Sequence, residues 1–201
     1  VLLEFNPILP EAYKTSDYVL LGNIDPDLQM KVIDQMSSKP KLVVLDTMNF
    51  WMDIALDKLK AVIAKVDVLT INDSEARQLS GEYSLVKAAK KILAFGPKYL
   101  IIKKGENGAL LFHENNIFFA PALPLEEVFD PTGAGDTFAG GFIGYIAKTG
   151  DTSFDNMKRA IIYGSAMASF CVEKFGTERL KELDIEEIHD RVEEFVSLSQ
   201  F

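Results

Sequence analysis

The sequence contains little cysteine, little histidine and no long apolar run. One cysteine, Cys171, and two histidines occur in 201 residues. A single cysteine excludes an internal disulfide and a cysteine-rich zinc site, and its apolar surroundings favour a small buried side chain in a reducing, cytoplasmic compartment. Two histidines in polar surroundings argue against a histidine metal centre or a Ser-His-Asp triad. The apolar runs fall far short of the roughly 20 residues that span a bilayer, so we expect no membrane partner.

Basic residues are scarce relative to acidic ones. Twenty-one Lys and Arg stand against 30 Asp and Glu, which gives a formal net charge of −9 at pH 7. A surface this acidic repels a polyphosphate backbone, and the lysine pairs at 90–91 and 103–104 form no basic patch. We therefore expect no nucleic-acid partner. Apolar residues make up 48% of the chain, enough to bury a core, which excludes a disordered protein.

Short apolar runs alternate with helical patterns along most of the chain. Strands are predicted at 17–22, 41–46, 66–72, 98–104, 109–113 and 116–120. One helix is predicted to begin at Pro26. Further helices are predicted at 52–64, at 73–79, around 85–93, and at 134–148, 154–174 and 185–196. Strands that alternate with helices predict βαβ units on a mostly parallel sheet. We expect an α/β fold with a doubly wound, three-layer, Rossmann-like sheet, in one domain over residues 1–201. The last helix is amphipathic, and we assign it no chemistry.

The most informative segment is a glycine-rich turn, Asp130-Pro131-Thr132-Gly133-Ala134-Gly135-Asp136. Its two glycines let the backbone approach a ligand closely, and the apolar run that follows opens a helix whose free N–H groups favour an anion. The structural alternative is an ordinary helix start that Asp130 or Thr132 caps.

Two common phosphate-binding motifs do not fit this turn. A Walker A loop needs Gly-x-x-x-x-Gly-Lys-Ser/Thr, a string that the sequence lacks, and a dinucleotide fingerprint needs glycine where Phe138 stands. Asp136 would repel the pyrophosphate of a dinucleotide. An acid among phosphate-binding amides is instead suited to accept a proton from an alcohol that attacks a γ-phosphate.

Taken in this order, the motifs resemble those of the ribokinase-like (PfkB-type) carbohydrate kinases. Residues 130–141 resemble the C-terminal signature of that family, in which Gly-Ala-Gly-Asp forms an anion hole and carries the catalytic base. Asn72-Asp73-Ser74-Glu75 resembles its Asn-x-x-Glu motif, and residues 103–108 resemble the strand and Gly-x-x-Gly turn that contacts nucleotide phosphates. Residues 46–49 resemble its Asp-Pro-Asn segment. The helix at 160–172 with Phe175-Gly176 resembles the wall of its adenine pocket.

The resemblance implies a cytoplasmic, ATP- and Mg²⁺-dependent kinase that phosphorylates a primary hydroxyl group of a sugar or nucleoside. It implies Asp136 as the base and the backbone amides of Gly133, Ala134 and Gly135 as the anion hole. It implies Asn72 and Glu75 for magnesium and Asp130 for a monovalent cation such as K⁺. As structural alternatives, Asn72 is also a good N-cap and Asp130 an ordinary turn residue. The implied nucleotide contacts are Lys104, Gly105, Asn107, Gly108, Thr132, Ala168 and Gly176.

Members of this family are longer, and their first part supplies a β-sheet lid that carries sugar contacts. Residues 1–5 read like a strand entered in mid-protein. We therefore expect that the lid is missing, that the chain is a fragment covering the C-terminal two-thirds of a kinase, and that a homodimer is the assembly to test. Phe50 and Trp51 stand where an arginine is common in the family. They could border a substrate, but we expect them to pack in the core.

Two other functions remain open. A non-catalytic nucleotide-binding or regulatory module would bind ATP without producing ADP in response to an added alcohol. A Rossmann-type dehydrogenase would bind a nicotinamide cofactor, but Phe138 and the helices that follow it disfavour this interpretation.

Overall fold

The structure of the chain is a computed structural model that describes residues 5–200. Of the strand expected at residues 1–5, the first four lie outside the described residues, and Phe5 belongs to no helix or strand. The chain divides into two compact units, residues 1–100 and 101–201. A single domain over the whole chain stays a prediction. Between residues 5 and 200, no helix is both long and apolar enough to cross a bilayer.

The described residues contain one sheet of six strands, which follow one another in chain order. Its strands are β1 (Tyr18–Leu21), β2 (Leu42–Asp46), β3 (Val68–Asn72), β4 (Tyr99–Lys103), β5 (Ala109–His113) and β6 (Asn116–Ala120). β2 pairs in parallel with both β1 and β3, whereas β5 and β6 form an antiparallel hairpin. Every residue of β2 is buried, as expected for a strand that reads as an unbroken apolar run. The predicted α/β class with a mostly parallel sheet is confirmed.

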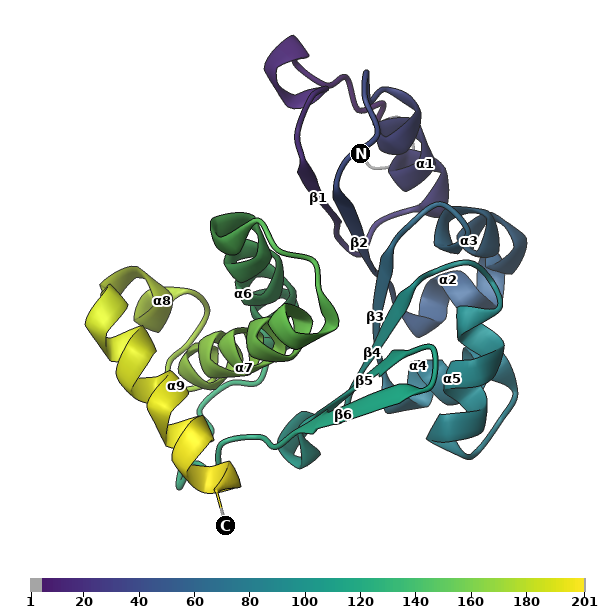
Figure 1. The fold of residues 1–201 in the computed structure, drawn as a ribbon. Coiled ribbons are helices and arrows are strands. Elements are labelled where there is room, and N and C mark those ends of the chain that lie inside the picture. Colours follow the sequence, from purple (N-terminus) through teal and green to yellow (C-terminus); the bar gives the residue numbers. More distant parts are fainter. Residues whose placement is uncertain (1–4, 201) are drawn as a thin grey trace. The chain divides into compact units, whose positions relative to one another are not determined.

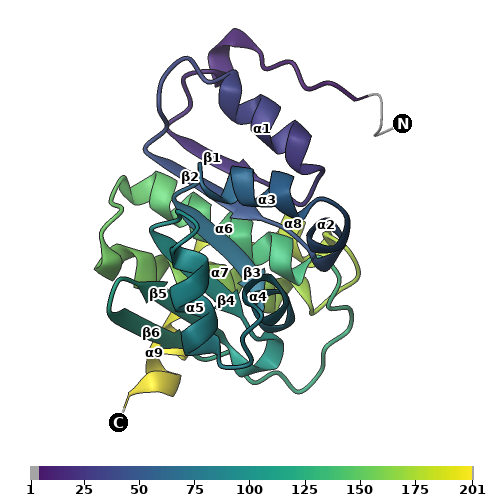
Figure 2. The same cartoon turned by 90° about the vertical axis from the view of Figure 1, so that its right-hand side faces the viewer.

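Five α-helices belong to the described part of the first unit. They are α1 (Pro26–Asp34), α2 (Asn49–Ile54), α3 (Leu56–Ile63), α4 (Asp73–Ser80) and α5 (Leu85–Leu93), and a short 3₁₀ helix, η2, spans Glu11–Tyr13. Figures 1 and 2 show α1 to α5 along one face of β1 to β3. The predicted signals set their ends: the Asp25 side chain accepts from the Asp27 N–H at 2.8 Å, and Gly81 ends α4 with φ of 69°.

The prediction of one helix over 52–64 is wrong. Ala55 leaves helical geometry, with φ −144° and ψ 34°, so the segment forms two helices. Both helices bury apolar residues, which is why the apolar spacing gave no sign of the break. The prediction that Phe50 packs in the core is also wrong, because 48% of its surface is exposed. Its ring lies edge-on against Trp51, whose indole N–H donates to Asn23 Oδ1 at 2.9 Å.

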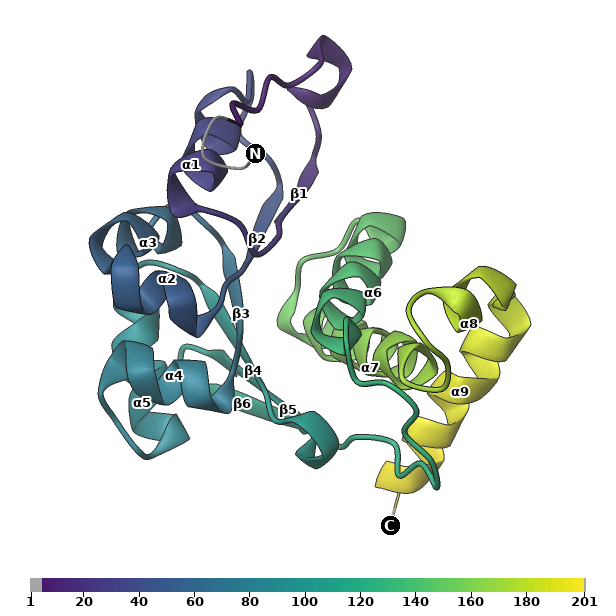
Figure 3. The same ribbon diagram turned by 180° about the vertical axis from the view of Figure 1, so that it is seen from behind.

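The second unit carries the remaining helices of the described chain. They are η3 (Gly105–Asn107), α6 (Ala134–Thr149), α7 (Phe154–Cys171), α8 (Glu178–Glu182) and α9 (Ile185–Ser199). α7 packs against α6, α8, α9 and the β5–β6 hairpin, and Figure 3 shows it between α6 and α9. α7 ends at Cys171, three residues earlier than predicted, and the short α8 was not predicted.

Candidate functional site

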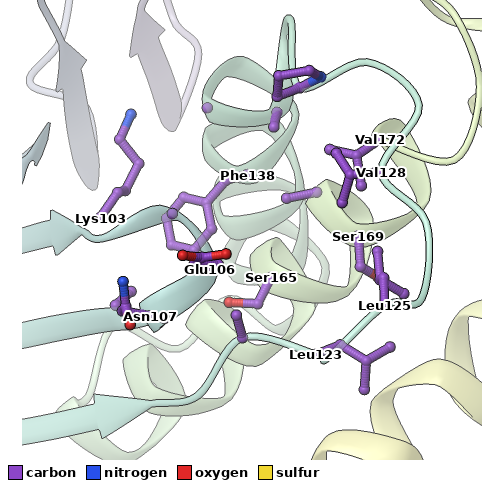
Figure 4. Close-up of a pocket in the computed structure, with 18 of the residues that line it drawn as sticks. Lys103, Glu106, Asn107, Leu123, Leu125, Val128, Phe138, Ser165, Ser169 and Val172 are labelled. Atoms are coloured by element: carbon purple, nitrogen blue, oxygen red, sulfur yellow. The ribbon is translucent and has the colours of Figure 1, made fainter.

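A cavity of about 780 Å³ lies within the second unit, a volume typical of small-molecule sites. Four segments form its wall: the turn after β4, the loop after β6, the start of α6 and the last turns of α7. Figure 4 shows Lys103 at the end of β4, Phe138 on α6, and Ser165 and Ser169 on α7 around it. Most of the wall is apolar, so its few polar groups determine which ligand atoms can be recognised.

The turn at residues 105–108 is shaped by its glycines. Asn107 N donates to Lys104 O at 3.0 Å, and Gly108 N donates to Gly105 O at 3.1 Å, so the turn is a single 3₁₀ turn. A Cβ atom at Gly108, where φ is 81°, would lie 2.1 Å from Ala120 O. Only glycine fits there. The predicted residues Gly105, Asn107 and Gly108 all line the cavity.

The two lysines before this turn lie in different surroundings. Lys104, the predicted phosphate contact, places Nζ 5.9 Å from the centre of the Phe119 ring and does not line the cavity. Lys103 does line it, and its Nζ lies 3.3 Å from the position that a Cβ atom on Gly135 would occupy. Successive strand residues point to opposite faces, so alternation indicated from the sequence that only one of the two lysines would face the cavity.

The glycine-rich turn begins α6. Gly133 is the N-cap, with φ 82° and ψ −1°, and Ala134 and Gly135 line the cavity. Ala134 N donates to Pro131 O at 3.2 Å, so this amide of the predicted anion hole already has an acceptor in the turn. Asp136 lies exposed in the first turn of α6 and outside the cavity lining.

Asp130 caps the turn from within. Its Oδ1 accepts from Thr132 N at 2.9 Å. Hydrogen bonds from the Thr132 backbone N–H, and then from its hydroxyl group, lower the pKa of Asp130 because both favour the charged carboxylate. The expected role as a turn residue is therefore present, and the monovalent-cation role stays a prediction. Thr132 is exposed and does not line the cavity.

The end of α7 holds the chain that enters this turn. Val172 O accepts from Phe129 N at 2.8 Å and from Asp130 N at 3.3 Å. Cys171 is buried, as predicted, and its Sγ lies 3.7 Å from Thr132 O. The loop is thus fastened to α7 immediately before its glycines.

α7 supplies a face of the cavity from the segment 160–172, in which Ala168 was the one residue named as a nucleotide contact. Ser165, Ala168, Ser169 and Val172 all line the cavity, at the spacing of one helix face. That spacing was readable in the sequence. Nothing in the sequence pointed to the lining loop at 122–125. Gly176, the other predicted residue of the adenine wall, is exposed and lies outside the lining.

Asn72 and Glu75 belong to the first unit, where they form a capping box at the start of α4. Glu75 N donates to Asn72 Oδ1 at 2.8 Å, and Asn72 N donates to Glu75 Oε2 at 2.7 Å. The structural alternative for this motif is therefore realised. Across residues 5–200 no group of three or more His, Cys, Asp or Glu side chains could hold a metal. A magnesium that keeps its waters and its nucleotide phosphates needs no such group.

Comparison with known proteins covers most of the chain. A cytidine kinase of Thermococcus kodakarensis is 33% identical over 140 residues, which is 67% of this chain and 49% of the relative. The chain thus spans about half the length of this curated relative. A ribokinase structure from Thermotoga maritima shares 27% identity and a TM-score of 0.70 over 88% of this chain and 57% of its own.

A further solved structure supports the fold of this chain and nothing beyond it. An aminoimidazole riboside kinase from Salmonella enterica, complexed with aminoimidazole riboside and an ATP analogue, is 21% identical with a TM-score of 0.71. The match covers 89% of this chain and 63% of that one. The profile of the pfkB family carbohydrate kinases matches residues 11–183. This chain therefore belongs to the pfkB family of carbohydrate kinases.

Proposed function

We propose that this chain carries the nucleotide site of a kinase that transfers the γ-phosphoryl group of ATP to a primary hydroxyl group of a sugar or nucleoside. The observation that carries the proposal is the cavity itself, which is lined by both the start of α6 and the turn at 105–108. Both are glycine-rich backbone segments that a phosphate chain can approach closely. Family membership supports the same reaction class.

The part of the cavity near the start of α6 is suited to an anion. α6 is 16 residues long, so its first amides and its dipole favour negative charge at its start. Lys103 adds a positive charge beside Gly135. In the proposed reaction, the amides of Gly133 and Gly135, joined by that of Ala134 when it is released from Pro131 O, stabilise charge that develops on the transferring phosphoryl oxygens.

Asp136 is the proposed general base. It accepts the proton of the acceptor hydroxyl group as that oxygen attacks the γ-phosphorus, and ADP leaves with the electrons of the broken bond. Its exposed position in the first turn of α6 leaves the carboxylate accessible to an incoming alcohol.

Bound magnesium would neutralise charge on the nucleotide phosphates. We assign Asn72 and Glu75 to hold it through its waters, and Asp130 to a monovalent cation.

Titration calorimetry of the chain with Mg-ATP tests the nucleotide site, and ADP release with ribose, fructose or cytidine as acceptor tests the transfer. We expect binding, and ADP release that depends on one of these alcohols. No heat of binding up to millimolar Mg-ATP would overturn the nucleotide site. Binding without alcohol-dependent ADP would instead support a non-catalytic nucleotide-binding module.

A further inference from the structure

Arg191, on α9, is a largely buried cation with three partners on α7 and just beyond it. Its side chain is 14% exposed. Nη1 donates to Ser169 Oγ at 2.8 Å, and Nη2 donates to Glu173 Oε1 at 2.7 Å. The guanidinium carbon lies 3.9 Å from the centre of the Phe170 ring, a close cation–π contact. Arg191 lies outside residues 11–183, the part that matches the family profile.

The residues that Arg191 holds are continuous with the cavity. Ser169 lines the cavity and donates its hydroxyl proton to Ala166 O at 2.7 Å, so its oxygen is free to accept from Arg191. Three residues further on, Val172 O accepts from the N–H groups of Phe129 and Asp130. A chain of direct contacts therefore runs from α9, through the end of α7, to the loop that enters the glycine-rich turn.

We propose that Arg191 is a positioning residue of the nucleotide site. It fixes the last turn of α7, which in turn sets the position of Ser169 in the cavity wall and of the loop at 129–132 before Gly133. Only the identity of the ligand rests on the proposed function. The positioning itself is a property of the unliganded chain.

A neighbouring arginine provides a matched control. Arg179 also pairs with Glu173, through Nε to Oε2 at 3.0 Å, and its guanidinium carbon lies 5.0 Å from the Phe170 ring centre. It is buried to a similar degree, with 17% of its side chain exposed. Its hydrogen bonds go to Glu173 and Glu187, and it does not contact Ser169. Removing Arg179 therefore weakens the same cluster without releasing the cavity wall.

The test compares Arg191→Met, Arg191→Lys, Ser169→Ala and Arg179→Met in two measurements. The first is amide hydrogen exchange at residues 129–135 and 165–172 in the unliganded chain. The second is Mg-ATP affinity by calorimetry. We expect Arg191→Met to speed exchange in both segments and to weaken Mg-ATP binding by about three- to tenfold, the range for a residue that couples to a site without touching its ligand.

The comparison variants separate positioning from general stability. Arg179→Met should lower the melting temperature as much as Arg191→Met does, yet change affinity by less than about twofold. Arg191→Lys should recover stability through Glu173 but not affinity, because lysine lacks the planar pair of donors that reaches Ser169 and Glu173 together. Ser169→Ala keeps the rest of the cluster and should reproduce the affinity loss. It serves as the test if Arg191→Met does not fold.

Two results would overturn the proposal. One is unchanged exchange at 129–135 in the Arg191 and Ser169 variants, and the other is equal affinity loss in Arg191→Met and Arg179→Met. If the parent chain binds no Mg-ATP, the proposed function fails, and the exchange measurement alone decides whether Arg191 positions the turn.

Discussion

A Cβ atom on Gly164 of α7 would lie 2.7 Å from the backbone carbonyl oxygen of Phe138 on α6. The two helices therefore touch through backbone at the level of the cavity, since Phe138 is one of its lining residues. Gly141 makes the reciprocal contact from α6, where a Cβ atom would lie 2.9 Å from Met167 Cγ. Side chains larger than hydrogen would push the two helices apart.

Gly164→Ala should destabilise the chain by about 1 to 3 kcal/mol, because the added methyl group meets backbone that cannot rotate away. Urea unfolding measures the change. Gly144→Ala, on α6, is the control: nothing lies within 4 Å of its Cβ position, and alanine there should stabilise the helix by about 0.5 to 1 kcal/mol. Equal stability of the two variants would contradict the close contact.

Lys103, which ends β4, and Lys104, which follows it, should differ in their effect on nucleotide affinity. Lys103→Met is expected to weaken Mg-ATP binding by about ten- to a hundredfold, the effect of losing one charge-assisted contact. Lys104→Met should leave the affinity close to that of the parent, because Lys104 lies against Phe119 and not in the cavity. Calorimetry on both variants decides this, and the reverse order would restore Lys104 as the phosphate contact.

Asp136→Asn should lower alcohol-dependent turnover by about two to four orders of magnitude, because an amide cannot accept the hydroxyl proton. Affinity for ATP should stay the same or improve slightly, since a negative charge near the γ-phosphate is removed. Initial rates of ADP release and calorimetry separate the two effects. A folded variant with the parent rate would remove Asp136 from the mechanism.

Glu75→Gln separates the metal role of this residue from its capping role. Glutamine keeps an oxygen that can accept from Asn72 N, so thermal stability should change little. The magnesium concentration needed for half-maximal turnover should rise, because the carboxylate charge near the metal waters is lost. Asn72→Ala is the contrasting variant and should cost about 1 kcal/mol of stability through loss of the cap. An unchanged magnesium titration in Glu75→Gln would leave the motif a capping box only.

Acid should weaken the attachment of α9. The hydrogen bond from Arg179 lowers the pKa of Glu187, because it favours the charged carboxylate. Burial raises this pKa but is the smaller effect. A carboxyl group whose folded pKa lies below its unfolded value, near 4.3, stabilises the fold fully above that value. This contribution disappears as the pH falls through the lower folded pKa.

Urea unfolding of the parent and of Glu187→Gln between pH 7 and pH 3 measures this contribution. The two stability curves should converge as the pH falls. Glu186→Gln, next in sequence, is the control and should follow the parent. Parallel curves for the parent and Glu187→Gln would contradict the ion pair with Arg179.

Much of the fold could be predicted, because local signals and tertiary structure agree. The runs at 41–46 and 66–72 are mostly apolar, and they form largely buried parallel strands. The break at Ala55 left no signal, since apolar spacing continues across it. The glycine-rich turn was identified from its composition, whereas the contact of Arg191 with Ser169 joins residues 22 positions apart and depends on how α9 packs.

The contacts of Gly108 also determine where residues can be inserted into this chain. Its carbonyl oxygen accepts from Lys104 N at 2.8 Å, and a Cβ atom on it would meet Ala120 O at the far end of the β5–β6 hairpin. One residue added to the turn would move both partners and reshape the cavity. The opposite end of the hairpin has no such tie: Glu114 and Asn115 are exposed at its tip, and Glu114 already takes a φ of 51°. An affinity tag or fluorophore belongs at that tip, where it would leave the register of both strands intact.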